Sequence, residues 1–480
     1  MDIHDSSESV EANKAISESR LALVKKFWQI FLIQSVVSLS RSGLMLNMLG
    51  ISNVIWPGES FHSVELGVIV STKMLAVAIT GIFYGILADK YSRKNLFGFV
   101  LILMGFGKFM NGFVPLYDSQ FAYILFIVWY GIFGIGQGGI NPLISSYSND
   151  ACEFDVRSRF FGLKEVFNQF FIIIGMIVSA WLIQVGLWRI YFWYTGILLI
   201  VCGFFIFFVI KEPKRGAMRE ELKSILSVES ISYKYKLNKK TIKSTIFSKS
   251  NILIFIEGIF TWILFSIAIY LIYPYIQSPP YNVSPVVSSI MMVIFGVPGA
   301  IFGAISFSRI SDKLAQKNVK YRVYLIVFSL LTLFGIVMSL FIVPLPQLSI
   351  EEANNLFNLF KYPIFVVFGI LLFILRAVLG IYNINQTPLI QIVNLPEAQG
   401  TIYSWNQFLE ELGYGIGPLI SGYLLSITNG NYVQTALFSM SLGIPAIFMW
   451  LLVNMWINKD IERIKKILEK RAEKLKNFQG

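Results

Sequence analysis

Charged side chains inside apolar segments are the residues of this sequence best suited to chemistry. Five of them fall near the middle of long apolar runs: Arg41, Lys73, Arg376, Glu410 and Glu411. A charged residue at the centre of a bilayer costs about 2.5–3.5 kcal/mol on insertion scales, and such residues usually mark binding sites or ion pathways. Each basic residue therefore needs a carboxylate, a ligand or water as its partner.

The charge balance of these five residues predicts the kind of ligand. Two glutamates can neutralise two of the three basic side chains, which leaves about one positive charge. A phosphate or carboxylate headgroup would balance it, and arginine binds such groups with paired hydrogen bonds. We therefore expect an anionic, amphipathic substrate. The alternative is that the basic residues form salt bridges with the glutamates that serve the fold and not a ligand.

The adjacent pair Glu410 and Glu411 cannot face one cavity together, because neighbouring residues of a helix point about 100° apart. Glu410 lies three residues after Gln407 and four after Asn406, which places it on their helix face. We predict that Glu410 faces the cavity and carries the coupling if a proton or sodium ion is transported.

Neutral amide side chains at similar depth add hydrogen-bonding groups, and several occupy positions related by an internal repeat. The predicted substrate-binding residues are Arg41, Lys73, Gln137, Asn141, Asn168, Gln169, Arg376, Asn383, Gln386, Asn406 and Gln407. We expect them to line one central cavity.

The elements that hold these residues are predicted from composition. The chain of 480 residues is 55% hydrophobic and 14% charged, and runs of about 20 apolar residues are long enough to cross a bilayer as helices. Strands of a β-barrel would alternate polar and apolar residues, which these runs do not. Twelve spans are predicted at residues 27–50, 63–88, 95–115, 120–147, 158–184, 188–210, 250–276, 285–309, 322–345, 363–391, 400–428 and 432–457.

The connections between spans separate by charge. Those on one side hold most of the Lys and Arg, above all residues 211–249, which predicts a cytoplasmic side with both termini on it. This topology accounts for the net charge of +12 without a nucleic-acid partner. The predicted organisation is a tail at 1–26, six-helix bundles at 27–210 and 250–457, a basic linker at 211–249 and an amphipathic helix at 458–480 lying near lipid headgroups.

No enzyme, cofactor or metal signature is present. There is no secretory signal and no Gly-Lys-Ser phosphate loop, and the glycines at 134–139 lie inside a span rather than after a strand. Two cysteines and two histidines, far apart in the sequence, predict neither a disulfide framework nor a metal site.

The two halves repeat. Residues 134–144 match 380–390 at constant offset, and Phe167-Asn-Gln-Phe followed by Gly175 matches Trp405-Asn-Gln-Phe followed by Gly413. Small residues at intervals of four in the second and eighth spans allow close helix packing, either for packing alone or for faces that also move.

The segment from Gly85 to Lys94, with Asp89 and Arg93, resembles the loop motif of the major facilitator superfamily between the second and third spans. The resemblance implies an all-helical membrane fold of twelve transmembrane helices in two pseudo-symmetric bundles. It also implies a charge relay of Asp89, Arg93 and Lys94 that stabilises one gate conformation. The predicted gating-motif residues are Gly85, Asp89, Arg93, Lys94, Arg159 and Asp312.

Within that superfamily, residues 27–216 look most like the spinster-like lipid transporters, through the glycine motif at 134–139, Trp188-Arg189 and Lys211-Glu-Pro-Lys-Arg. Ser40 and Gln137 stand where these proteins usually carry acids. This departure puts proton coupling through those positions in doubt.

The resemblance implies a secondary or facilitative transporter in the cell membrane that works by alternating access, as a monomer, on a lysophospholipid-like or sphingolipid-like molecule. A transporter of other organic anions or drugs, a receptor or sensor that has lost transport, and a lipid-scrambling protein are the alternatives.

Overall fold

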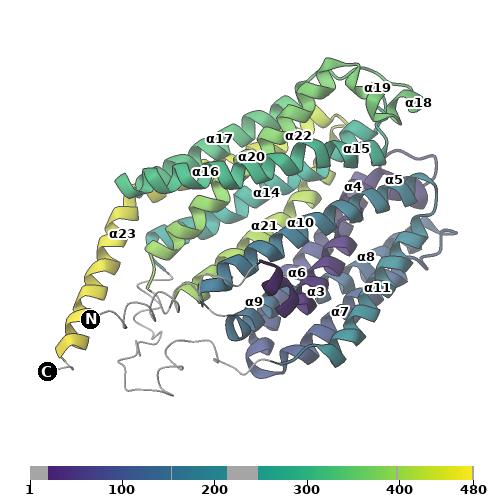
Figure 1. Cartoon of the computed structure of the whole chain (residues 1–480). Helices are drawn as coiled ribbons and strands as arrows, with labels where there is room; N and C mark the ends of the chain where they lie inside the picture. The colour runs from purple at the N-terminus through teal and green to yellow at the C-terminus, as the bar shows by residue number, and fades with distance from the viewer. Residues whose placement is uncertain (1–19, 153, 213–246, 396–397, 478–480) are drawn as a thin grey trace, which may run out of the picture.

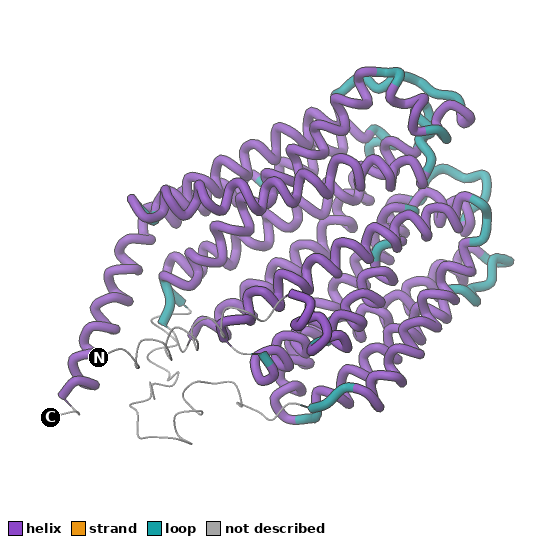
Figure 2. The backbone as a smooth tube through the Cα atoms, in the orientation of Figure 1, coloured by secondary structure: helices purple, strands orange, loops and turns teal. Residues whose placement is uncertain are grey.

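The computed structural model describes residues 20–152, 154–212, 247–395 and 398–477, and in these residues it contains helices and loops and no strand (Figures 1 and 2). The first half holds α2 (Arg20–Lys26), α3 (Trp28–Arg41), α4 (Gly43–Leu46), α5 (Met48–Ile55), α6 (Ser63–Lys90), α7 (Arg93–Asn111), α8 (Ser119–Gln137), α9 (Ile140–Ala151), α10 (Phe154–Gln184) and α11 (Trp188–Val209). The second half holds α14 (Lys249–Gln277), α15 (Pro285–Met291), the π-helical turn η1 (Met292–Gly296), α16 (Val297–Lys317), α17 (Lys320–Ile342), α18 (Ile350–Ala353), α19 (Leu356–Phe360), α20 (Pro363–Ile392), α21 (Gln399–Ile427), α22 (Tyr432–Ser441) and α23 (Ile444–Asn477).

The helices agree with the predicted spans. Nine of those in the described residues are long and apolar enough to cross a membrane. The other three predicted spans coincide with the broken run α3–α5, with α7 and with α21. They carry polar or charged side chains in the interior, with Lys108 and Asn406 buried and Arg41 at the cavity. The first of these spans is broken into helices too short to cross a membrane, and all three bring polar groups into the interior.

The first span is interrupted directly after Arg41, where α3 ends and α4 begins. The hydroxyl of Tyr191 on α11 donates to the carbonyl of Ser40 and accepts from the backbone N–H of Gly43 (3.0 and 3.1 Å). Backbone groups released by a break inside a membrane need such partners. Tyr191 therefore holds the turn that presents Arg41.

Two helix bundles lie side by side in Figure 1, the N-terminal bundle (α3–α11) in purple to teal and the C-terminal bundle (α14–α23) in teal-green to yellow. Their internal packing repeats as the sequence predicts. A Cβ added to Gly175 on α10 would meet the carbonyl oxygen of Leu39 at 2.3 Å, and one added to Gly413 on α21 would meet that of Ile259 at 2.3 Å. Each glycine allows the matching pair of helices to touch backbone to backbone.

The linker end of the molecule is the end where α11 stops and α14 starts. The bundles are joined at the opposite end. Ser63 Oγ donates to the carbonyl of Gly422 (2.8 Å), and the hydroxyl of Tyr270 donates to the carbonyl of Ser63. Gln277 Nε2 donates to the carbonyl of Leu46 (3.0 Å). These contacts close the end of the molecule remote from the linker.

The C-terminal segment predicted as a separate amphipathic helix continues α23 without a break, and α23 projects beyond the bundles in Figure 1. Its first turns stay attached, since Asp460 accepts from the backbone N–H of Ser250 (3.2 Å) and Ile464 is buried. The predicted N-terminal tail is described only from residue 20, and most of the basic linker lies outside the described residues.

Candidate functional site

A cavity of about 400 Å³ lies between the bundles, and helices of both bundles form its wall. Five of the eleven predicted binding residues line it: Arg41, Lys73, Gln137, Gln169 and Arg376. Glu411 is the single acidic residue of this wall, so the basic side chains exceed the acidic ones by two. The positive excess is larger than the sequence predicted.

Arg41 is positioned by an amide rather than by an acid. Its Nη2 donates to Asn168 Oδ1 on α10 (2.8 Å). The same oxygen accepts from Ser38 Oγ (2.7 Å) and Gln34 Nε2 (3.0 Å). Asn168 in turn donates to Glu165 Oε1 (2.8 Å). Because the direct partner is neutral, Arg41 keeps its full charge for a ligand.

Lys73 and Arg376 face the cavity from opposite bundles. Among the described residues, no salt bridge joins Arg41, Lys73 or Arg376 to a carboxylate. Arg376 Nε is buried without a hydrogen-bond partner. A buried N–H group without a partner is costly, and an anion bound in the cavity could accept from it. The absence of these salt bridges argues against the alternative that the three basic residues pair with Glu410 or Glu411 for structural reasons.

The two adjacent glutamates take the reverse of their predicted positions. Glu411 lines the cavity, and Glu410 does not. The shared face of Glu410 and Asn406 is confirmed, because Asn406 Nδ2 donates to Glu410 Oε1 (2.7 Å). That face points into the C-terminal bundle, because Glu410 also accepts from Gln386 Nε2 on α20 (2.7 Å). Spacing along α21 identified the shared face, and tertiary packing set its direction.

Other predicted binding residues also lie off the cavity wall. Gln386 and Asn406 belong to the Glu410 network, and Asn168 lies behind Arg41. Asn141 and Asn383 are exposed and Gln407 is partly buried, and none of the three lines the cavity.

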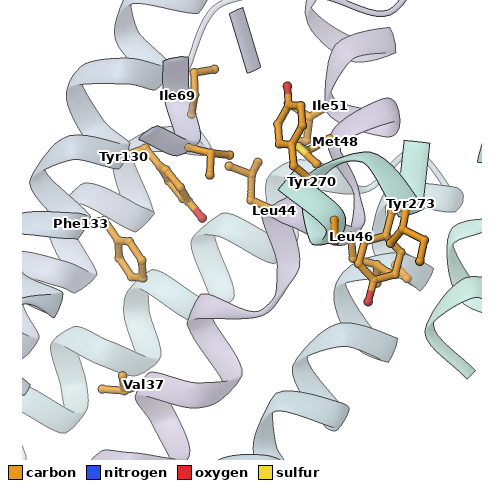
Figure 3. Close-up of a cluster of buried hydrophobic side chains, with 14 of the residues drawn as sticks. Val37, Leu44, Leu46, Met48, Ile51, Ile69, Tyr130, Phe133, Tyr270 and Tyr273 are labelled. Atoms are coloured by element: carbon orange, nitrogen blue, oxygen red, sulfur yellow. The ribbon is translucent and has the colours of Figure 1, made fainter. Parts of the chain in front are cut away.

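One side of the cavity is aromatic, which the sequence reading did not assign. Trp262 and Tyr414 pack edge to face with ring centroids 5.8 Å apart, and Phe265 lies beside both. Leu46 and Tyr273, from opposite bundles, complete this apolar side and lie next to each other in Figure 3. Trp262, Phe265 and Tyr273 recur at helical spacing on α14, a pattern that could have revealed the face.

Two bundles around a cavity, with paired helix contacts that repeat between the halves, describe a known architecture. The sequence pattern of the Major Facilitator Superfamily matches residues 30–418. The chain belongs to the Major Facilitator Superfamily. It is therefore a multi-pass membrane transporter and not an enzyme.

Among curated proteins, the niacin transporter NiaP of Acinetobacter baylyi (strain ATCC 33305 / BD413 / ADP1) is 24% identical over an alignment of 280 positions, which covers 52% of this chain and 60% of NiaP. The chain thus spans less than two thirds of that relative. A bacterial homologue of the human lysosomal transporter Spinster, inward-facing and unoccupied, superposes with a TM-score of 0.68 at 15% identity over 92% of this chain and 99% of that one.

The nucleoside transporter NupG gives a TM-score of 0.60 at 14% identity, over 89% of this chain and 98% of that one. A D-xylose–proton symporter gives a TM-score of 0.60 at 15% identity, over 92% of this chain and 97% of that one. At such identities the likeness shows the superfamily fold, and the spinster-like branch stays a prediction.

The superfamily loop motif has an acidic partner, to which the sequence analysis assigned no role. Glu212, after α11, accepts from Ser92 Oγ (2.9 Å) and from the backbone N–H groups of Arg93 and Lys94 (3.2 and 2.8 Å). A carboxylate at the N-terminus of α7 is stabilised by the helix dipole. Arg93 Nη1 lies 3.3 Å from Glu212 Oε1, so this residue binds the motif to the end of α11.

The remaining gating-motif residues are placed only in part. In the second-half copy, Asp312 pairs with Arg322 (2.7 Å). Gly85 lies on α6 with nothing near an added Cβ. The side chains of Asp89 and Arg159 lie outside those that the structure describes.

Two buried ionisable residues are absent from the predicted site residues. Lys108 on α7 is fully buried, and its Nζ lies 4.6–5.3 Å from the ring centroids of Tyr191, Phe192, Phe133 and Tyr130. Glu257 on α14 is fully buried in the C-terminal bundle. The lysine could have been found as a lone charge in the apolar run 95–115.

Proposed function

We propose that this superfamily member transports an organic anion with an apolar portion, by alternating access between the bundles. One observation carries the proposal: three basic side chains, none in a salt bridge with a described carboxylate, face a cavity shared by both bundles. Arg41, Lys73 and Arg376 would bind the anionic group, while Trp262, Phe265 and Tyr414 would pack against the apolar portion.

The direction of opening follows from the same geometry. The hydrogen bonds between the bundles close the end remote from the linker, so the cavity would exchange with the linker side. The lysine-rich linker favours a cytoplasmic position for that side, in the cell membrane, with both termini cytoplasmic. The structure would then correspond to the inward-facing state of a transport cycle.

Two sources of the anion share this chemistry, a lysophospholipid-like lipid and a small organic acid. The spinster-like sequence pattern and fold support the first, and the likeness to a niacin transporter supports the second. The cavity volume of about 400 Å³ accommodates a small acid whole or the headgroup end of a lysolipid.

The test reconstitutes the full chain in liposomes and measures uptake of labelled nicotinate and labelled lysophosphatidylglycerol. Arg376→Ala should weaken binding of the transported anion about 10- to 100-fold, the cost of a lost charge-assisted hydrogen bond. Arg189→Ala, on the N-terminal bundle outside the cavity wall, is the control. Binding without flux would favour a receptor or sensor. Unchanged affinity in both Arg41→Ala and Arg376→Ala would contradict the proposed site.

A further inference from the structure

A histidine between two glutamates lies directly before α6, at the end of the molecule remote from the linker. His62 Nε2 lies 2.9 Å from Glu59 Oε2, and its Nδ1 lies 3.4 Å from Glu65 Oε1. A neutral imidazole ring carries one N–H group, whereas a protonated ring carries two. Only the protonated form of His62 therefore presents a proton to both carboxylates at once.

The surroundings of this ring suit a positive charge. The ring of His62 stacks on Trp56 of α5, with the ring centroids 4.1 Å apart and the planes at 12°. The negative face of an indole ring attracts a cation. The backbone N–H of His62 donates to Ser52 Oγ (3.2 Å), which holds the loop against α5. The side chain is 21% exposed, so water at this end of the molecule can supply and remove its proton.

The next residue makes the contacts that close this end. Ser63 Oγ donates to the carbonyl of Gly422 (2.8 Å), and the carbonyl of Ser63 accepts from the hydroxyl of Tyr270. Glu65 also interacts electrostatically with Tyr270, whose side chain is fully buried in the C-terminal bundle. The carboxylate of Glu65 thus lies between His62 of its own bundle and a residue of the opposite bundle.

No other positive group balances these carboxylates in the described part of the chain. Glu59 and Glu65 form no salt bridge there with a lysine or an arginine. The titratable side chains that act on Glu65 from the packed helices are Tyr123 of α8 and Tyr270 of α14, and α5 has no charged residue. A carboxylate that loses water at a closing interface needs a compensating charge. His62 is placed to provide it.

We propose that protonation of His62, from the side remote from the linker, stabilises the closed state of that end, and that loss of the proton favours its opening. This regulation rests on the proposed function, because closing and opening of this end are steps of alternating access. When the bundles meet, the imidazolium balances the partly dehydrated Glu65. When they separate, water solvates the carboxylate and the imidazolium contributes less.

The sign of the pH effect follows from this difference. The protonated ring stabilises the closed end at acidic pH, and the stabilisation is lost as the pH rises through the range in which histidine titrates, between about pH 5 and about pH 8. Removal of the proton also leaves the carboxylates of Glu59 and Glu65 without a cation between them, so they repel each other and loosen the loop that carries Ser63. Acidification on this side should therefore slow the opening step.

The experiment measures the distance between the bundles and needs no substrate. Spin labels are placed on Tyr117→Cys, between α7 and α8, and on Phe357→Cys of α19, two exposed positions on opposite bundles. The native cysteines are buried. Pulsed electron spin resonance of the full chain in lipid nanodiscs then follows the closed and open populations. Acidification across the histidine range should raise the ratio of closed to open molecules at least about threefold, as expected for two partly exposed ion pairs. A ratio that does not change with pH overturns the proposal.

Variants assign the response to this cluster. His62→Gln keeps a hydrogen-bonding side chain that cannot be protonated, and Glu65→Gln removes the charge that the imidazolium balances, so both should abolish the pH dependence. His4→Gln, the same change at the other histidine of the chain, is the matched control. A pH response retained in His62→Gln overturns the proposal.

Anion uptake measured on the same protein separates the two claims. A pH-dependent distance without anion binding or uptake counts against the proposed function alone. Uptake with a distance that is indifferent to pH counts against the role of His62 alone.

Discussion

The two bundles bury ionisable groups by different means. In the N-terminal bundle, Lys108 Nζ has no hydrogen-bond partner among the described residues and is surrounded by four aromatic rings. In the C-terminal bundle, Glu257 is equally buried but accepts hydrogen bonds from Thr261 and Tyr382. One bundle surrounds its buried group with ring faces, and the other with hydroxyl donors.

The difference follows from the charge distribution of aromatic rings. Their faces are negative, so they attract an ammonium group but repel a carboxylate. Packing residues can therefore hold a buried lysine, whereas a buried glutamate requires donors placed by several helices. The hydroxyl of Tyr191, fixed by Ser40 and Gly43, keeps one such ring face in place over Lys108. The buried glutamate therefore requires more precisely placed partners than the buried lysine.

The largest effect is expected from reversing the charge inside the aromatic cage. Lys108→Glu would place a carboxylate against four ring faces and should lower the free energy of unfolding by about 4 kcal/mol or more. Lys108→Met, of similar length and without charge, should retain the fold. Thermal unfolding in detergent measures both variants. Equal stability of the two variants would contradict the role assigned to the rings.

A smaller effect is expected where a single amide controls a charge in the cavity. Asn168→Asp would turn the neutral partner of Arg41 into a salt-bridge partner and should weaken anion binding about tenfold. Asn454→Asp, on α23 away from the cavity, is the control for an added charge. Titration of the transported anion tests the change. Unaltered affinity would show that Arg41 does not bind the anion.

The smallest effect is expected at an exposed lysine over one ring. Lys249 Nζ lies 4.7 Å from the ring centroid of Trp456, and the side chain is exposed. Lys249→Met should change the free energy of unfolding by about 0.5–1 kcal/mol at most. Thermal unfolding beside the Lys108 variants gives the comparison. A larger loss than in Lys108→Met would reverse the order that burial predicts.

The sequence by itself determined the fold and the central charges. Apolar runs of span length must become helices, because lipid offers no partner to backbone N–H and C=O groups. The repeat around Gly175 and Gly413 predicted matching helix contacts, which both glycines make. Arg41, Lys73 and Arg376 were predicted at the cavity because charged groups within a membrane avoid lipid, and all three line it.

Only the tertiary structure decided which way each polar face points. Helical spacing places Glu410 and Asn406 on one face of α21. It does not determine whether that face points to the cavity or into the bundle. Glu411 lines the cavity because of how α21 is rotated against α14 and α6, a rotation set by backbone contacts at Gly413 and Gly67. The cage around Lys108 and the network around Glu257 draw residues from helices far apart in the chain, so local spacing contains no trace of them.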